Sequence, residues 1–248
     1  MLHLDEFRGR FLVLDGPDGS GKTTVLPRVA EQLRARGLAV TQCKDPGGTA
    51  VGDRVRSVIL DHDLRGMHPA CETLLFMASR AQLVAEIVRP ALDRGDVVLC
   101  DRFVSATCAY QVAAGFDHDA IIALARYAIG NTWPDLTILL DVPCDIGFAR
   151  VRQRALAAGA HGGRPGLDSM ESRPRAFHEA VRRHFLALAE RYPAPVAVVD
   201  ATPSVESTTQ ELLRQLEISF SVGRAGAHPR GRSAPARLTG APMRSDTD

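Results

Sequence analysis

The chain has 248 residues, 45% of them hydrophobic, which is enough for one globular domain with a sizeable core. Its formal net charge is only +1, so composition alone indicates neither a nucleic-acid partner nor a membrane partner. The sequence predicts no signal peptide and contains no apolar run of the roughly 18 residues that a membrane span needs. Its five cysteines are scattered. We therefore expect a cytoplasmic protein without a disulfide framework or a zinc site.

Strand and helix patterns alternate along the chain. Short apolar runs predict buried strands, and the longer stretches between them predict helices. This alternation is typical of an α/β fold in which a parallel sheet carries helices on both faces. The predicted strands cover residues 11–15, 38–43, 97–101, 136–142 and 195–200, and the predicted helices cover residues 23–36, 50–60, 70–94, 103–130 with a break, 144–157, 172–192 and 203–219.

The loop after the first predicted strand reads GPDGSGKT, a complete phosphate loop of the form G-x-x-x-x-G-K-[ST] between a strand and a helix. Its glycines let successive backbone N–H groups turn toward phosphate oxygens. Lys22 supplies a charge for the β- and γ-phosphates, and Thr23 offers a hydroxyl to Mg²⁺. The predicted ATP-binding residues are Gly16, Pro17, Asp18, Gly19, Ser20, Gly21, Lys22, Thr23 and Thr24.

An acid-base pair, Asp101 and Arg102, ends the third predicted strand. An aspartate at a strand end beside a phosphate loop can hold Mg²⁺, directly or through water. The alternative, an aspartate that caps the next helix, is as common. The adjacent Arg102 favours the metal, because a cation there faces the same phosphates.

Three further side chains are candidates for a second ligand site. Phe76 and Arg80 lie four residues apart on one predicted helix, so they share a face and could form a slot for a base. Phe76 could equally be a core residue, and Arg56 a solvated surface charge. The segment Lys44–Thr49 (KDPGGT) could be no more than a turn before a helix.

Arginines gather beside a glycine- and alanine-rich stretch at residues 155–168. Arg150, Arg152 and Arg154 precede the stretch, and Arg164 lies within it. They form either a solvated helix face or a lid whose charges close on a transferring phosphate. Residues 221–248 hold almost no large apolar side chain, so we expect a disordered tail after a domain of residues 1–220.

Taken together, these segments resemble the bacterial type of thymidylate kinase, which has a simple phosphate loop and an arginine-bearing lid. The resemblance runs from about Phe11 to Phe220. It is carried in order by LDGPDGSGKTT, by KDPGGT with VRSVIL, by LLFMASRAQLV, by LCDRFVSATCAYQ, and by PDLTILLDV with VVDAT. It implies a P-loop NTPase-type three-layer sandwich with a five-stranded parallel sheet and a lid at about residues 150–170.

The resemblance also implies phosphorylation of dTMP to dTDP with MgATP, and a homodimer. Phe76 would stack on thymine, Arg80 and Thr107 would bond its edge, Asp18 would bind the 3′-hydroxyl, and Tyr110 would exclude a ribose. The implied catalytic residues are Lys22, Arg102, Arg150, Arg152 and Arg154; the substrate-binding residues are Asp18, Arg56, Phe76, Arg80, Arg102, Thr107, Tyr110 and Gln111; and the metal-binding residues are Thr23 and Asp101.

The sequence departs from the family pattern in three places. Ser169 stands where the family usually has an arginine, the lid is longer around Ala157–Pro165, and Ala106 replaces the usual serine. Two alternatives therefore stay open. One is a kinase of another or modified nucleoside monophosphate, and the other is a P-loop nucleotide-binding switch without a small-molecule acceptor.

Overall fold

The computed structural model describes residues 4–61, 63–64, 66–157 and 170–221. Most of the predicted lid and all but one residue of the predicted tail lie outside these ranges. Within them, no helix is long and apolar enough to cross a membrane.

Five parallel strands form one sheet in the order β2-β3-β1-β4-β5. The strands are β1 (Phe11–Asp15), β2 (Val40–Lys44), β3 (Val97–Asp101), β4 (Leu136–Asp141) and β5 (Val196–Asp200). Strand β1 lies at the centre, paired with β3 on one side and β4 on the other. Because all strands run in one direction, their carboxyl ends share one edge, which is where ligands collect in such sheets.

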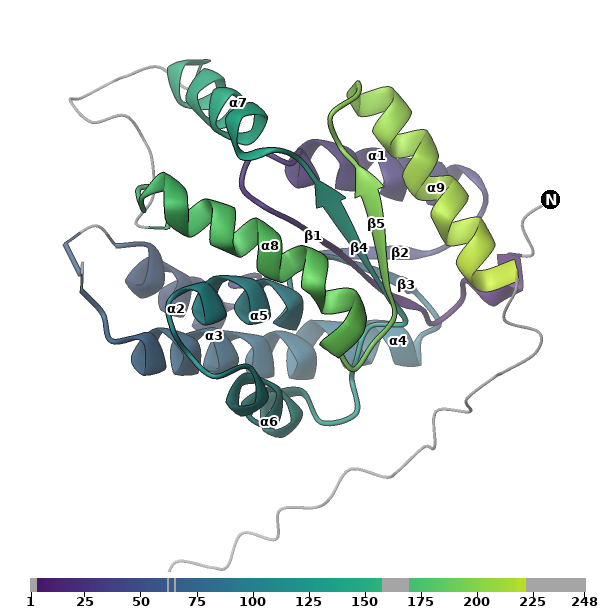
Figure 1. The fold of residues 1–248 in the computed structure, drawn as a ribbon. Coiled ribbons are helices and arrows are strands. Elements are labelled where there is room, and N and C mark those ends of the chain that lie inside the picture. Colours follow the sequence, from purple (N-terminus) through teal and green to yellow (C-terminus); the bar gives the residue numbers. More distant parts are fainter. Residues whose placement is uncertain (1–3, 62, 65, 158–169, 222–248) are drawn as a thin grey trace, which may run out of the picture.

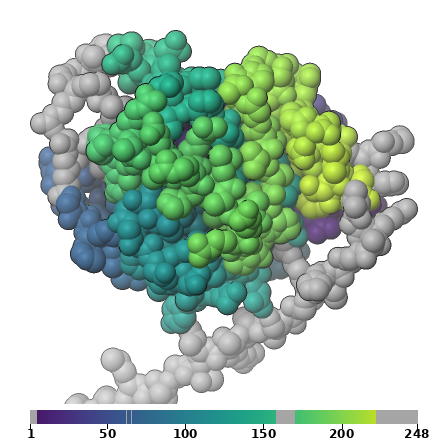
Figure 2. Space-filling view, viewed as in Figure 1, coloured from purple at the N-terminus to yellow at the C-terminus, as the bar shows by residue number. Residues whose placement is uncertain are grey.

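Helices cover both faces of the sheet, so the molecule has three layers (Figure 1). Helices α1 and α9 lie on one face, and α3, α5 and α8 lie on the other. The space-filling view shows α8 and α9 covering much of the near face (Figure 2). The described helices are α1 (Lys22–Ala35), α2 (Ala50–Leu60), α3 (Pro69–Leu83), the π-helical turn η2 (Val84–Val88), α4 (Arg89–Asp93), α5 (Val104–Ala113), α6 (His118–Ile129), α7 (Cys144–Ala157), α8 (Arg175–Arg191) and α9 (Val205–Ser221), after a short 3₁₀ turn η1 (Leu4–Glu6).

Strand β1 separates two hydrophobic cores. Its side chains alternate between the faces of the sheet, as the two-residue period of a strand requires. Phe11 and Val13 pack with α3, α5, α6 and α8, whereas Leu12 and Leu14 pack with α1 and α9. All five residues of β1 are buried, which explains why the strand reads as a continuous apolar run.

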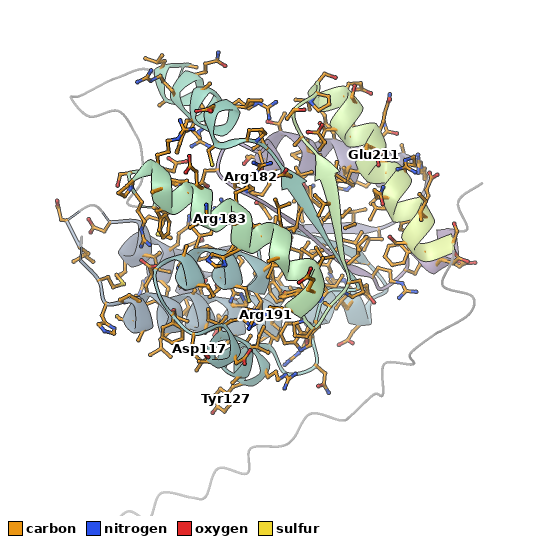
Figure 3. All side chains as sticks on the ribbon, viewed as in Figure 1. Asp117, Tyr127, Arg182, Arg183, Arg191 and Glu211 are labelled. Atoms are coloured by element: carbon orange, nitrogen blue, oxygen red, sulfur yellow. The ribbon has the colours of Figure 1, made fainter. Side chains whose placement is uncertain are left out.

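An ion pair fastens α8 to the sheet. The guanidinium of Arg182, labelled in Figure 3, binds both carboxylate oxygens of Asp141 at the end of β4, at 2.7 and 2.8 Å. Planar two-point contacts of this kind fix orientation as well as distance. Helix α8 is thereby held next to the carboxyl edge of the sheet.

The predicted fold class is confirmed by the five-stranded parallel sheet with helices on both faces. The largest difference in the elements is the predicted helix over residues 70–94, which consists of α3, η2 and α4 in succession. Helix α8 begins at Arg175 rather than near residue 172, because Pro174 favours the first turn of a helix over its interior. Helix α9 extends to Ser221, one residue into the predicted tail.

Candidate active site

The phosphate loop joins β1 to α1 at the carboxyl edge of the sheet. Gly16 and Gly19 adopt φ angles of 136° and 76°, a region that favours glycine. A side chain would also collide there, because a Cβ would lie 2.4 Å from the Leu140 carbonyl oxygen at Gly16 and 2.2 Å from the Gly147 carbonyl oxygen at Gly19. The glycine spacing therefore serves both the curvature of the loop and its close packing on β4 and α7.

Lys22 curls back over the loop that precedes it. Its side-chain Nζ donates to the carbonyl oxygens of Gly16 and Pro17, both at 2.9 Å, and to Ser20 Oγ at 3.3 Å. Burial lowers the pKa of Lys22 to about 8, with the charge of Arg102 acting in the same direction. A phosphate anion in the loop would compensate this buried charge.

A cleft of about 760 Å³ opens in front of the loop. The predicted ATP-binding residues from Asp18 to Thr24 line it, while Gly16 and Pro17 supply carbonyl acceptors to Lys22. The opposite wall comes from α7 and from the residues around the start of α9. Arg150 and Arg154 of α7 were predicted as lid residues, but the part of this wall around the start of α9 was not; it includes Ala201, Pro203, Ser204, Val205 and Thr208.

A smaller cavity, of about 80 Å³, adjoins the cleft. It contains all of the predicted substrate-binding residues, which come from the phosphate loop, α2, α3, the end of β3 and α5. The two cavities share Asp18, Asp45, Arg56 and Arg102. The lining of the smaller cavity is Asp18, Asp45, Pro46, Arg56, Leu60, Phe76, Arg80, Arg102, Ala106, Thr107, Tyr110, Gln111 and Met170.

Arg80 is almost completely buried, with 1% of its surface exposed, and most of its donors are already used. Its Nε donates to Asp45 Oδ2 at 2.6 Å, and its Nη2 donates to the Phe103 carbonyl at 3.0 Å and to Thr107 Oγ1 at 3.1 Å. Its Nη1 also contacts the sulfur of Met77 at 3.2 Å. Because a guanidinium has five N–H groups, one N–H on Nη1 is left for a ligand in the cavity.

Arg102 and Asp18 meet where the two cavities join. The Nη2 of Arg102 donates to Asp18 Oδ1 at 2.5 Å, and the hydroxyl of Tyr110 donates to Asp18 Oδ2 at 2.8 Å. Each oxygen of the Asp18 carboxylate therefore already accepts one hydrogen bond, and a sugar hydroxyl, which the family resemblance implies for Asp18, would be an additional partner. A carboxylate has about four acceptor positions, so it can still accept one more.

The electrostatic balance at Asp18 favours its charged form. Burial alone would raise the pKa of Asp18, but the charges of Arg102 and Lys22 and the hydrogen bond from Tyr110 bring it below its ordinary value.

Arg102 has a φ of 66°, the only positive φ among the non-glycine residues that the structure describes. Strained backbone of this kind gathers at functional sites, and here it turns the guanidinium toward the phosphate loop.

Asp15, which was not predicted as a site residue, contacts both the phosphate loop and Arg102. It is fully buried at the end of β1, where its carboxylate accepts from the Gly16 N–H at 2.9 Å and from Ser105 Oγ at 2.6 Å. The Nη1 of Arg102 lies 3.6 Å away. Burial raises the pKa of Asp15, although Arg102 and Lys22 oppose that shift.

Thr23 and Asp101 both line the cleft and suit a magnesium ion bound with phosphates. The Oδ1 atom of Asp101 is buried and has no hydrogen-bond partner among the residues that the structure describes, so an acceptor there is available to a cation. No cluster of three or more His, Cys, Asp or Glu side chains in the described ranges could hold a metal without other ligands. That sparse set fits Mg²⁺, which takes one or two protein ligands and completes its shell with phosphate oxygens and water.

The three predicted lid arginines have different surroundings. The Nη1 of Arg150 donates to the carbonyl oxygens of Ala201 and Gly19, at 2.9 and 3.4 Å, so it bridges the two walls of the cleft. Arg154 also lines the cleft and forms an ion pair with Glu171. Arg152 is exposed and belongs to neither cavity as far as the structure describes their linings. Arg164 and Ser169 lie outside the described residues.

Sequence reasoning also missed three side chains around the smaller cavity. Asp45 holds Arg80, and Glu72 accepts from Gln111 Nε2 at 2.8 Å and from Arg173 Nη2 at 2.6 Å. One signal was present in the sequence. Glu72 stands four residues before Phe76 and therefore lies on the helical face that carries the predicted base slot.

Comparison with known proteins identifies the family. The family profile described as thymidylate kinase matches residues 14–212. The chain is 41% identical to the thymidylate kinase of Exiguobacterium sp. (strain ATCC BAA-1283 / AT1b) over 206 residues, which cover 83% of this chain and 92% of that protein. It is 43% identical over 212 residues to the thymidylate kinase of Pseudomonas syringae pv. tomato, covering 84% and 96%, and 43% identical over 204 residues to that of Syntrophotalea carbinolica, covering 82% and 92%. These matches, which agree with a phosphate-loop cleft joined to a second cavity, show that the chain belongs to the thymidylate kinase family.

Proposed function

We propose that the chain transfers the γ-phosphoryl group of ATP to dTMP and so produces ADP and dTDP. Family membership supports the reaction. The structural observation that supports this reaction is that the two cavities meet; both are lined by Asp18, Asp45, Arg56 and Arg102. A kinase of a small acceptor needs two ligand sites that meet at the transferring phosphate, whereas a nucleotide switch needs only one.

The large cleft is the proposed site for ATP. The N–H groups of the loop and the dipole at the start of α1 would bind the phosphates. Lys22 would exchange its backbone acceptors for phosphate oxygens. Thr23 and Asp101 would hold Mg²⁺, which would supply positive charge to offset that of the phosphates.

The smaller cavity is the proposed site for dTMP. Phe76, half-buried at its wall, would stack on the base, with Arg80, Thr107 and Gln111 along the edge of the ring. Asp18 and Tyr110 would contact the sugar. Arg56 and Arg102 line both cavities, and they would bind the acceptor phosphate at the boundary with the donor site.

Alignment and charge stabilisation account for the chemistry. The acceptor phosphate of dTMP is already an anionic nucleophile, so no residue has to remove a proton from it. An oxygen of that phosphate attacks the γ-phosphorus, and the bond to the β,γ-bridging oxygen breaks as ADP leaves. Lys22 and Arg102 would neutralise the negative charge that builds up on the transferring group. The lid would supply further positive charge from Arg150, Arg152 and Arg154.

The same proposal covers the organisation of the chain. Residues 1–220 would form the kinase domain, residues 150–170 the lid, and residues 221–248 a tail outside it. The chain would also be a homodimer, as the family resemblance implies. Val51 and Val58 on α2 and Leu74 on the adjacent α3 are 39–54% exposed and would gain burial in a dimer. Light scattering coupled to gel filtration tests this directly.

A panel of nucleoside monophosphates with MgATP tests the function. We expect ADP and dTDP to form together only when dTMP is present. Faster ADP formation with another monophosphate would favour the related kinase. ADP formation at one rate with and without any monophosphate would contradict every kinase assignment and favour the nucleotide switch. Lys22→Ala controls for contaminating kinases and should be inactive.

A further inference from the structure

A buried carboxylate on α3 joins two parts of the proposed dTMP site. Glu72 is only 5% exposed. Its Oε1 accepts from Gln111 Nε2 of α5 at 2.8 Å, and its Oε2 accepts from Arg173 Nη2, just before α8, at 2.6 Å. A charge buried to this extent persists because each of its oxygens has a donor.

The bond from Gln111 fixes which end of its amide faces the cavity. The two ends of a glutamine amide have nearly the same shape, so packing alone does not distinguish them. An ionised carboxylate can only accept, and it therefore holds the NH₂ end of Gln111. The carbonyl Oε1 is left for the cavity that Gln111 lines.

The Arg173 contact determines what a neutral residue at position 72 would do. Arginine can only donate, so a glutamine there would have to give its carbonyl oxygen to Arg173. Its NH₂ group would then face Gln111 and would demand an acceptor. Gln111 would have to turn its amide over and present NH₂ to the ligand.

We propose that Glu72 is a positioning residue that sets base selectivity by orienting the Gln111 amide, with Arg173 locking the arrangement. This inference rests on the proposed function. A thymine ring carries a donor, N3–H, where cytosine has an acceptor, and a carbonyl oxygen at Gln111 matches the donor. A buried polar group facing a like group rejects the wrong ligand strongly.

Arg173 also holds the segment that covers the cavity. Its guanidinium carbon lies 4.6 Å from the centre of the Phe177 ring, and its backbone N–H, which any residue except proline would keep, donates to the Met170 carbonyl at 3.2 Å. Met170 lines the cavity. Loss of the Arg173 side chain removes its contacts with Glu72 and Phe177, so it should weaken the binding of every nucleotide by a similar factor, because the Gln111 amide keeps its orientation.

The test is kcat and KM for dTMP and dCMP with Glu72→Gln, Arg173→Met, the double variant and Gln111→Leu. Glu72→Gln should raise KM for dTMP more than it lowers kcat, and should reduce the dTMP-to-dCMP ratio of kcat/KM by about tenfold. Arg173→Met should keep the wild-type ratio. The double variant should recover part of the ratio, because the glutamine at position 72 is then free to turn. Gln111→Leu should also reduce the dTMP-to-dCMP ratio of kcat/KM. This variant tests the role of the Gln111 amide even if Glu72→Gln does not fold.

Glu86→Gln is the matched control. Glu86 accepts from Gln82 on the exposed side of η2, so it offers the same pair of groups outside the cavities. It should leave both constants unchanged. An unchanged ratio in Glu72→Gln or Gln111→Leu, or no recovery in the double variant, would overturn the inference. An inactive wild type would instead overturn the proposed function, and this inference with it.

Discussion

The guanidinium of Arg102 lies 2.5 Å from the carboxylate of Asp18, and the two residues form an ion pair where the cleft and the smaller cavity meet. The pair joins the end of β3 to the phosphate loop, although the residues are 84 positions apart. Tyr110 holds the second oxygen of Asp18. The carboxylate is therefore oriented before a ligand binds, and its charge holds Arg102 at the boundary between donor and acceptor.

Asp18→Asn should lower kcat/KM for dTMP by about 10- to 100-fold, which corresponds to about 1.5–3 kcal/mol. The variant keeps the shape of the side chain, but it removes the charge and turns an NH₂ group toward one of the two donors. Asp145→Asn is the control, because Asp145 also pairs with an arginine at 2.5 Å but has a side chain that is 71% exposed. Steady-state kinetics on both variants measures the difference, and equal losses would contradict a specific role for Asp18.

The lowered pKa of Lys22 predicts a pH effect on ATP use. Lys22 carries its charge below a pKa of about 8 and loses it above. The pH dependence of kcat/KM for ATP reports groups of the enzyme form to which ATP binds, before ATP is bound. We therefore expect kcat/KM for ATP to fall as pH rises through about 8, at saturating dTMP. A profile that stays level up to pH 9.5 would contradict the lowered pKa.

The same residue predicts a pH-dependent difference in stability. In the unfolded chain Lys22 should titrate near 10.5, so between pH 8 and 10.5 the unfolded state holds a proton that the folded state lacks. Wild type should therefore gain stability relative to Lys22→Met as pH rises across this range, by roughly 3 kcal/mol in all. Urea unfolding of both proteins at pH 7, 9 and 10.5 measures the free energies. A constant difference would contradict the prediction.

Local patterns predicted the sheet and the phosphate loop well, because both are encoded in short segments. Each apolar run corresponds to one strand, but the prediction of buried strands was wrong for the edge strands β2 and β5, which are only partly buried. The glycines of the loop follow a fixed spacing within one short segment. The split of residues 70–94 was harder to predict. No glycine or proline lies within residues 70–89, so no residue type marks the change from α3 to η2.

The contacts that orient the site could not be predicted, because they join residues far apart in sequence. Arg80 reads as a base-binding arginine, yet Asp45, 35 positions away, and Thr107, 27 positions away, take up two of its five N–H groups. Glu72 reads as an ordinary helix residue until Arg173, 101 positions away, is placed beside it. Charge and periodicity indicate which residues share a face, but partner choice depends on how the helices pack.

The lid arginines should differ in their contributions to the rate. Arg154 lines the cleft and Arg152 does not, among the residues described, so we expect Arg154→Ala to lower kcat by about 10²-fold and Arg152→Ala to cost less. KM for dTMP should change little in both variants, because these charges act on the transferring phosphate. Arg183→Ala, at an exposed site on α8 labelled in Figure 3, is the control and should match wild type. Unchanged kcat in both lid variants would indicate a solvated helix face.

Tyr110 should set the preference for deoxyribose. Its ring is 5% exposed, lies against Phe177 and Phe185 at 6.2 and 5.9 Å between ring centres, and is held in place by the hydroxyl bond to Asp18. A ring fixed on three sides cannot move away from an added 2′-hydroxyl, so a ribose should clash with it. We expect wild type to prefer dTMP to its ribo analogue, and Tyr110→Ala to narrow the ratio of kcat/KM values.

Tyr110→Phe keeps the ring and should keep most of the preference, although loss of its bond to Asp18 should lower kcat/KM for both substrates by about tenfold. Measuring both substrates on the three proteins separates the two effects: a preference that survives Tyr110→Ala would show that another residue discriminates the sugar, and a preference lost in Tyr110→Phe would assign it to the hydroxyl rather than to the ring.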